Sequence, residues 1–119
     1  MNSDILLIIN NMFTKLSNDT TCETVSDGWI EISFPFLNRI NDGICIYAKI
    51  DGDKILFSDD GEAIDLFLLG GKSIDDAEIY ARTHGVKIVG NELRLEAKMD
   101  DAVDAMAQFL ACVISIGNA

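Results

Sequence analysis

Ile55-Leu56-Phe57-Ser58-Asp59-Asp60-Gly61-Glu62-Ala63-Ile64-Asp65 joins an apolar strand, an acidic turn and the start of a helix within eleven residues. Asp59 stands three residues before Glu62, which is the spacing of a capping box. In that arrangement Asp59 accepts a hydrogen bond from a backbone N–H of the first helical turn, and Glu62 reaches back to the cap. Gly61 would let the chain bend sharply between strand and helix. The stretch therefore predicts a strand-to-helix transition.

The segments before this stretch predict strands. Residues 29–36 and 44–50 alternate apolar and polar side chains with a period of two. Turn residues at 26–28 and at 51–52 precede the next strand in each case, so we expect residues 21–25 to pair with 29–36, and 44–50 with 53–58. Pro35 cannot donate to a ladder and should lie at an edge or a strand end. These segments predict a four-stranded antiparallel meander.

The remaining segments predict helices and one further hairpin. Residues 5–16 have an apolar stripe wider than one face of a small domain needs, which predicts a buried or a dimerising helix. Glycine-rich stops at 70–71 and 85 end two further helices, the second of which has Ser73 as its N-cap.

Residues 86–89 and 92–96 would form a short hairpin, and a last helix would begin near Asp100 or Asp101 and run to Ile116. The last helix is expected to point one set of apolar residues inward and to leave Phe109, Cys112 and Ile116 on its other side. The inward set is Val103, Met106, Ala107, Leu110, Val113 and Ile114. The predicted fold class is α+β: an N-terminal helix, the meander, two helices, the hairpin and a C-terminal helix, in a single domain over residues 1–119.

Composition limits the class of protein further. The 119 residues include twenty acidic and nine basic residues, for a formal charge of −11. This charge repels phosphate backbones and anionic membranes within a Debye length of roughly 8 Å, so neither direct nucleic-acid binding nor membrane binding is expected. The three cysteines include no Cys-x-x-Cys pair, and no secretory signal or spanning segment is evident. We expect a soluble cytoplasmic protein.

The acidic residues are concentrated in one part of the sequence. Between residues 51 and 65 only Lys54 is basic. The window indicates either a solvated, solubilising surface or a surface made for a basic partner. The candidate partner-binding residues are Asp51, Asp53, Asp59, Asp60, Glu62, Asp65, Asp75 and Asp76.

The same carboxylates allow a metal hypothesis. Asp59, Asp60 and Glu62 together with Asp51 or Asp53 would offer the hard oxygen ligands that Mg²⁺ and Ca²⁺ prefer. The spacing does not match the calcium-binding loop template. The capping arrangement therefore remains the favoured interpretation, and no metal or other cofactor is expected.

Catalysis has weak support in the sequence. His84 is the only histidine and would act as a base only if Ser73, Thr83 or a cysteine lay within hydrogen-bond reach. No nucleophile elbow, phosphate-binding loop or dinucleotide fingerprint occurs. The sequence therefore predicts that the protein is not an enzyme.

Three segments together form a specific pattern: Ser33-Phe34-Pro35-Phe36-Leu37, Asp42-Gly43-Ile44-Cys45-Ile46-Tyr47, and the stretch from Ile55 to Ala63. In this order they resemble a small bacterial and phage family, domain of unknown function 1828. The resemblance covers about residues 28 to 116. It implies a setting in prophages and mobile elements, and thus in phage–host conflict, and it implies no activity.

The leading hypothesis is a protein that binds another protein with a basic surface. It would inhibit a nucleic-acid-binding host protein or a defence complex by offering carboxylates where a nucleic-acid phosphate would lie. One alternative is a metal-dependent hydrolase or nuclease that uses the same carboxylates with His84 as base. Another is an assembly module in which the terminal helices form a homodimer, because both helices have surplus apolar surface.

Overall fold

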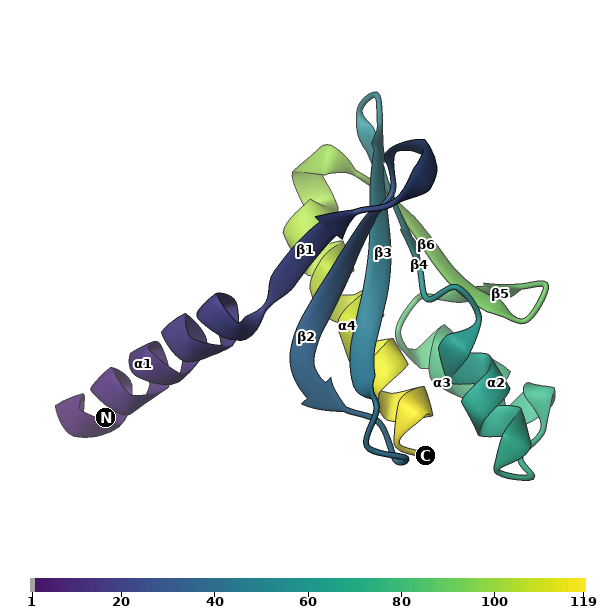
Figure 1. The fold of residues 1–119 in the computed structure, drawn as a ribbon, viewed down its shortest axis with the longest axis horizontal. Helices are drawn as coiled ribbons and strands as arrows, with labels where there is room; N and C mark the ends of the chain where they lie inside the picture. Colours follow the sequence, from purple (N-terminus) through teal and green to yellow (C-terminus); the bar gives the residue numbers. More distant parts are fainter. Residues whose placement is uncertain (1) are drawn as a thin grey trace.

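A computed structural model describes residues 2–119 as one antiparallel six-stranded sheet with four helices. The helices are α1 (Ser3–Asp19), α2 (Glu62–Leu69), α3 (Ile74–Thr83) and α4 (Ala102–Gly117). The strands are β1 (Thr21–Thr24), β2 (Ile30–Leu37), β3 (Gly43–Asp51), β4 (Lys54–Ser58), β5 (Lys87–Val89) and β6 (Glu92–Lys98). Short 3₁₀ turns precede β2 at Ser26–Gly28 and α4 at Met99–Asp101. The α+β class and the order of elements are confirmed (Figure 1).

The second hairpin is part of the main sheet. The strand order is β1-β2-β3-β4-β6-β5, so β6 pairs with β4 and β5 forms the far edge. The sequence separates this hairpin from the meander by two helices, which is why the expectation was four strands and a hairpin rather than six strands in one sheet. Because β4 lies between β3 and β6, the acidic turn that follows β4 emerges from the middle of the sheet.

Pro35 lies where β2 stops regular pairing. The β2–β3 register shifts between Ser33 and Leu37, and β1 pairs only with β2 residues 30–33. Pro35 therefore lies in an irregular part of the strand, beyond the end of its edge neighbour, where its missing N–H is tolerated.

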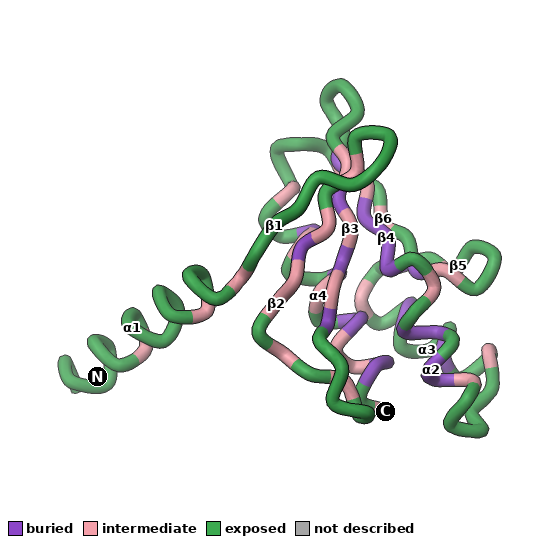
Figure 2. Tube along the Cα trace, viewed as in Figure 1, coloured by how far each residue is buried: buried purple, intermediate pink, exposed green. Residues whose placement is uncertain are grey.

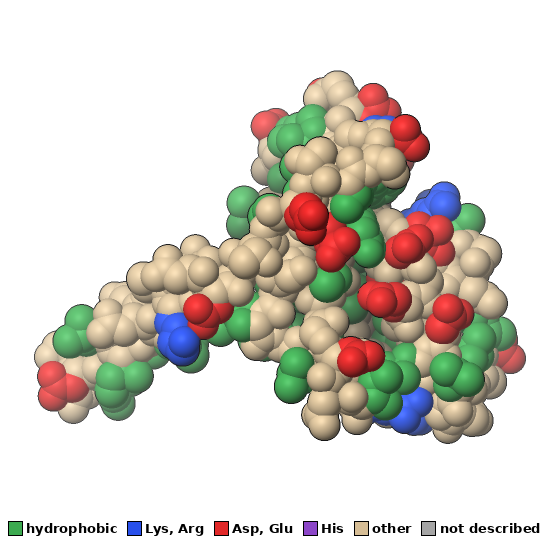
Figure 3. Space-filling model, in the orientation of Figure 1, with side chains coloured by type: hydrophobic (Ala, Val, Ile, Leu, Met, Phe, Trp, Pro, Cys, Tyr) green, Lys and Arg blue, Asp and Glu red, His purple; other side chains and the backbone are tan. Residues whose placement is uncertain are grey.

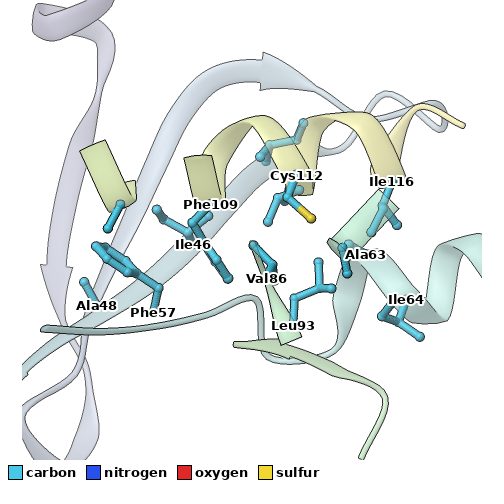
Figure 4. Close-up of a cluster of buried hydrophobic side chains, with 14 of the residues drawn as sticks. Ile46, Ala48, Phe57, Ala63, Ile64, Val86, Leu93, Phe109, Cys112 and Ile116 are labelled. Atoms are coloured by element: carbon cyan, nitrogen blue, oxygen red, sulfur yellow. The ribbon is translucent and has the colours of Figure 1, made fainter. Parts of the chain in front are cut away.

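Helices α2, α3 and α4 cover one face of the sheet. Ile46, Phe57 and Leu93 point from three adjacent strands into the core, where Phe57 stacks on Phe109 of α4 at a centroid distance of 5.6 Å (Figure 4). Helix α2 packs against α4 and β6, and α3 packs against α4 and β5. In Figure 1, β2 and β3 lie in front of α4, so the view shows the uncovered face of this part of the sheet.

The inward face of α4 is only partly the predicted one. Val113 is buried, and Met106, Leu110 and Ile114 pack partly buried against the core, as predicted. Phe109, Cys112 and Ile116 are also buried, whereas Val103 is 83% exposed. A stripe through Val103 and Met106 and a stripe through Phe109 and Cys112 are both apolar, so helical periodicity did not distinguish them. The aromatic side lies against the sheet.

Helix α1 extends away from the sheet (Figures 1 and 2). None of its residues is buried, which contradicts the buried alternative predicted for this segment. Its N-cap is Asn2, whose side chain accepts a hydrogen bond from the Asp4 backbone N–H at 2.8 Å. The dimerising alternative stays a prediction.

Candidate functional site

The uncovered face of the sheet has a row of polar residues that crosses all six strands. Strand pairing places them directly opposite one another in the order of the strands. The row consists of Glu23, Glu31, Tyr47, Ser58, Arg94 and Lys87, and we call it the polar row. It is acidic over β1 and β2, hydroxylic over β3 and β4, and basic over β6 and β5. The row therefore has a charge gradient across the sheet.

A hydrogen-bond network fixes the basic half of the polar row. The Ser58 hydroxyl accepts the Asp60 backbone N–H at 3.0 Å and donates to the Glu92 carboxylate. The other Glu92 oxygen accepts from Arg94 Nη2 at 3.0 Å. The Arg94 hydrogen bond, supported by Ser58, lowers the pKa of Glu92 below its usual range. Glu92 is therefore held ionised between a hydroxyl and a guanidinium.

In the acidic half of the polar row, by contrast, no guanidinium or ammonium group neutralises the carboxylates within residues 2–119. Glu23 and Glu31 face each other across β1 and β2, and like charges in this position are destabilising. Burial, followed by the charges of Asp59, Asp60, Glu31 and Asp42, raises the pKa of Glu62. Among residues 2–119, no ion pair involves Glu23, Glu31, Asp60 or Glu62. This end of the row is a concentration of unneutralised negative charge.

Tyr47 lies between the two halves. Burial is the main cause that raises its pKa to about 12. The charges of Glu31, Glu62 and Asp60 contribute to the same rise, because a phenolate beside them would add another negative charge. Tyr47 therefore keeps its proton at neutral pH and remains a hydrogen-bond donor.

Two adjoining hollows lie along the polar row. One, of about 470 Å³, is lined by Glu31, Tyr47, Ser58 and Asp60, among others. The second, of about 560 Å³, has apolar walls that include Leu56 and Val89. Trp29, Glu92 and Arg94 line both hollows. Figure 3 shows acidic side chains, in red, around a recess with apolar side chains inside it.

Asp59 is not part of this surface. It is 1% exposed, and its carboxylate accepts backbone N–H groups from Gly61 at 3.0 Å, Ala63 at 3.0 Å and Leu93 at 2.8 Å. Burial raises its pKa despite these hydrogen bonds. Asp59 was predicted to bind a partner, but its position is structural: it ties the turn and the start of α2 to β6.

The capping box is therefore only half formed. Asp59 bonds a first-turn N–H as predicted, but the N-cap residue is Gly61, at φ 82°, and makes no side-chain cap bond. Asp60 also has a left-handed backbone, with φ 56°. The sequence pattern did not reveal the bond to Leu93, because β6 begins about thirty residues later.

The other predicted acids do not form one surface with Asp60 and Glu62. Asp51 and Asp53 lie at the β3–β4 turn, at the opposite end of β4 from Asp60. Asp65 is in the first turn of α2, and Asp75 and Asp76 are in the first turn of α3. Within residues 2–119 no group of three or more His, Cys, Asp or Glu side chains is placed to hold a metal ion. The acidic residues predicted to bind a partner therefore lie in at least three separate parts of the molecule.

His84 has a local role. It is the C-cap residue of α3, and its Nδ1 lies 2.8 Å from the Tyr80 carbonyl oxygen one turn earlier. Within residues 2–119 its side chain hydrogen-bonds this backbone oxygen and not Ser73, Thr83 or a cysteine, so the geometry gives no support to the catalytic alternative.

Sequence reasoning missed every member of the polar row. Each member occupies a polar position of an alternating strand, the ordinary pattern of a half-buried sheet. The turn at 90–91, as predicted, fixes the pair Lys87–Arg94, whereas the pair Tyr47–Ser58 follows from a turn at 52–53, one residue later than the predicted 51–52. The pairing of β6 with β4 crosses two helices, so the complete row required the structure.

These features define a class: a small antiparallel α+β protein with helices on one face of its sheet and a charged, hollowed opposite face. The chain belongs to the family described as Domain of unknown function DUF1828, which matches residues 34–116. Tyr47, Ser58 and Arg94 lie inside the matched region, whereas α1, β1 and Glu31 lie outside it. No curated protein and no solved structure gives a significant match. None of the helices in the part described is both long and apolar enough to cross a membrane.

Proposed function

We propose that this protein acts by binding another protein on the open face of its sheet. The partner places lysine or arginine side chains against the acidic half of the polar row, around Glu31 and Asp60. The observation that carries the proposal is the directly opposed pair Glu23 and Glu31, which has no basic neighbour in ion-pair contact within residues 2–119. Like charges held this way cost stability in the free protein, and a basic partner would relieve that cost.

The two hollows offer a partner apolar contacts in addition to the charge of the acidic half. Trp29 stands between them, and Lys49 Nζ lies 5.9 Å from the centroid of its ring. Tryptophan and arginine side chains are enriched among the residues that dominate binding energy in protein interfaces. A partner's basic side chain in the first hollow and an apolar one beside Leu56 in the second would use both chemistries.

The biological role we propose is inhibition. A protein of formal charge −11 competes with nucleic acid for a basic surface, because both present dense negative charge. The mobile-element setting implied by the family resemblance is consistent with a target in host defence, either a nucleic-acid-binding protein or an interference or restriction complex. The phosphate mimics would then be Glu23 and Glu31 together with Asp60 and Glu62, the two of the eight residues picked from the sequence that lie near the polar row.

The test is affinity capture from host lysate at low and high salt, with mass spectrometry of the captured proteins and competition by DNA or RNA. The informative variant is Glu31→Lys, which we expect to weaken capture about tenfold at low salt, a change of about 1.4 kcal/mol. The same change places a lysine opposite Glu23, so folding stability should rise by roughly 0.2–1 kcal/mol. Lost binding with gained stability is not the result of misfolding.

Glu78→Lys is the matched control. Glu78 is an exposed residue in the middle of α3, on the helix-covered side, and its reversal changes net charge by the same amount. Equal loss in both variants would show that only net charge matters and would refute a role for the open face. Capture that neither salt nor competing nucleic acid reduces would contradict the mimicry.

A further inference from the structure

Helix α1 exposes more apolar surface than any other helix of the fold. Ile5, Ile8, Ile9, Met12, Phe13 and Leu16 lie along one side at helical spacing, and we call them the apolar stripe. Ile8 is 66% exposed, Phe13 is 60% exposed and Ile5 is 50% exposed. The opposite side carries Asn10, Asn11, Thr14 and Asn18, with Leu7 among them at 59% exposure. The helix is amphipathic, yet its apolar side faces water.

An isolated helix of this length gains little stability from its own backbone. Isolated helices shorter than about 12–15 residues are marginal in water even when they are rich in alanine, which α1 is not, and most helical stability in proteins comes from packing of an apolar face. Helix α1 spans 17 residues and has no buried residue, and its largest contact with the sheet is a small one with β2. The apolar stripe therefore indicates a partner surface.

The charges of α1 and of the rest of the chain indicate what kind of surface covers the apolar stripe. Only Asp4, Lys15 and Asp19 are charged in α1, and Lys15 pairs with Asp19 at 2.8 Å. Nearly all of the −11 charge therefore lies in the rest of the chain. Helices that lie on membranes are rich in basic residues, and α1 has one. A second copy of α1 meets the apolar stripe without bringing the acidic sheets together, provided that the two helices run antiparallel.

The available area is sufficient for a weak pair. If each of the six stripe side chains contributes about 100 Å², one copy offers about 600 Å² and two copies about 1,200 Å², where specific interfaces begin. Such an interface is at the small end of the range, so the expected dissociation constant is micromolar.

We propose that α1 is a dimerisation element, and that two copies of this chain pair antiparallel along the apolar stripe. In this arrangement the body of each copy lies beyond the N-terminal end of its partner's helix, because α1 extends away from the sheet (Figure 1). The open faces of both sheets stay free, so a dimer presents two copies of the polar row. The inference is independent of the proposed binding function.

The experiment is sedimentation equilibrium of the full chain from micromolar to about half-millimolar concentration. We expect a reversible shift from 13.0 kDa to twice that mass. Ile8→Gln should weaken the dimer at least tenfold. Leu7→Gln is the matched control: it is the adjacent residue on the same helix, similarly exposed and on the opposite side, and it should leave the dimer unchanged. Near-ultraviolet circular dichroism of Trp29 should be the same in both variants.

Three results would overturn the inference. One is a monomer across the whole range, whether or not the helix then binds vesicles of anionic phospholipid. Another is equal weakening by Ile8→Gln and Leu7→Gln, since this would show that the apolar stripe is not the interface. A third is a dimer that strengthens steeply between low and high salt, because that would place the acidic bodies side by side and exclude the antiparallel arrangement.

Discussion

The two faces of the sheet are built from the same strands but differ in what they contribute. Phe57 and Ser58 are neighbours in β4, yet Phe57 stacks on Phe109 in the core, whereas Ser58 lies in the polar row and donates a hydrogen bond to Glu92. Similarly, Ile46 is fully buried, whereas Tyr47 faces the hollow between Glu31 and Ser58. The covered face supplies the apolar burial that holds the fold together. The open face can therefore hold opposed like charges that reduce stability.

The same contrast is found at the turn after β4, between adjacent carboxylates. Asp59 is buried with three backbone partners, and Asp60 is exposed beside the acidic half of the row. One positions the turn and the other contributes charge to the surface. The sequence alone does not distinguish the structural role of Asp59 from the surface position of Asp60.

The largest expected effect is on the covered face. Phe57→Ala removes a side chain that is 1% exposed and leaves a cavity beside Phe109, so the free energy of unfolding should fall by about 3–5 kcal/mol. Urea unfolding followed by tryptophan fluorescence measures it. Tyr47→Phe, on the open face, keeps the ring and should change stability by less than about 1 kcal/mol. Similar losses for the two variants would remove the distinction between the faces.

The next effect separates the adjacent carboxylates. Asp59→Ala leaves the N–H groups of Gly61, Ala63 and Leu93 without their acceptor, which should cost about 2–4 kcal/mol. Asp60→Asn should cost less than about 0.5 kcal/mol, because asparagine tolerates the left-handed backbone found there. In native-state hydrogen exchange, the amides of Ala63 and Leu93 should lose protection only in Asp59→Ala. Unchanged exchange in that variant would refute the structural role.

The covered face was largely predictable from the sequence and the open face was not. Alternation in residues 29–36 and 44–50 and the turn at 90–91 predicted strands and a hairpin because these are local signals. The turn expected at 51–52 lies one residue later, because Asp51 still pairs with Lys54. The β4–β6 pairing and the Asp59–Leu93 bond connect residues more than thirty positions apart, and no local pattern encodes them. A run of acids in sequence consequently suggested one surface, whereas the structure gathers acids from β1, β2 and the turn after β4.

The smallest effect compares, by pH, two glutamates that lie beside the polar row: Glu62 near its acidic half and Glu92 near its basic half. The pKa of Glu62 is raised in the folded protein, so between its ordinary value near 4.5 and that raised value the native state holds more protons than the unfolded state. Its contribution to stability therefore becomes less favourable as pH rises through this window. Glu62→Gln removes the penalty, so the variant should be more stable than the wild type at neutral pH and the gain should disappear below about pH 4.

Glu92→Gln should give the opposite sign. The pKa of Glu92 is lowered by Arg94 and Ser58, so its contribution to stability is present above its ordinary pKa and is lost as pH falls through the lowered value. The variant should be less stable than the wild type at neutral pH, and the difference should shrink in acid. Both side chains are partly exposed, so solvent screening keeps each difference below about 1 kcal/mol. Urea unfolding from pH 3 to 8 measures both, and differences of the same sign would contradict the opposite electrostatic surroundings of Glu62 and Glu92.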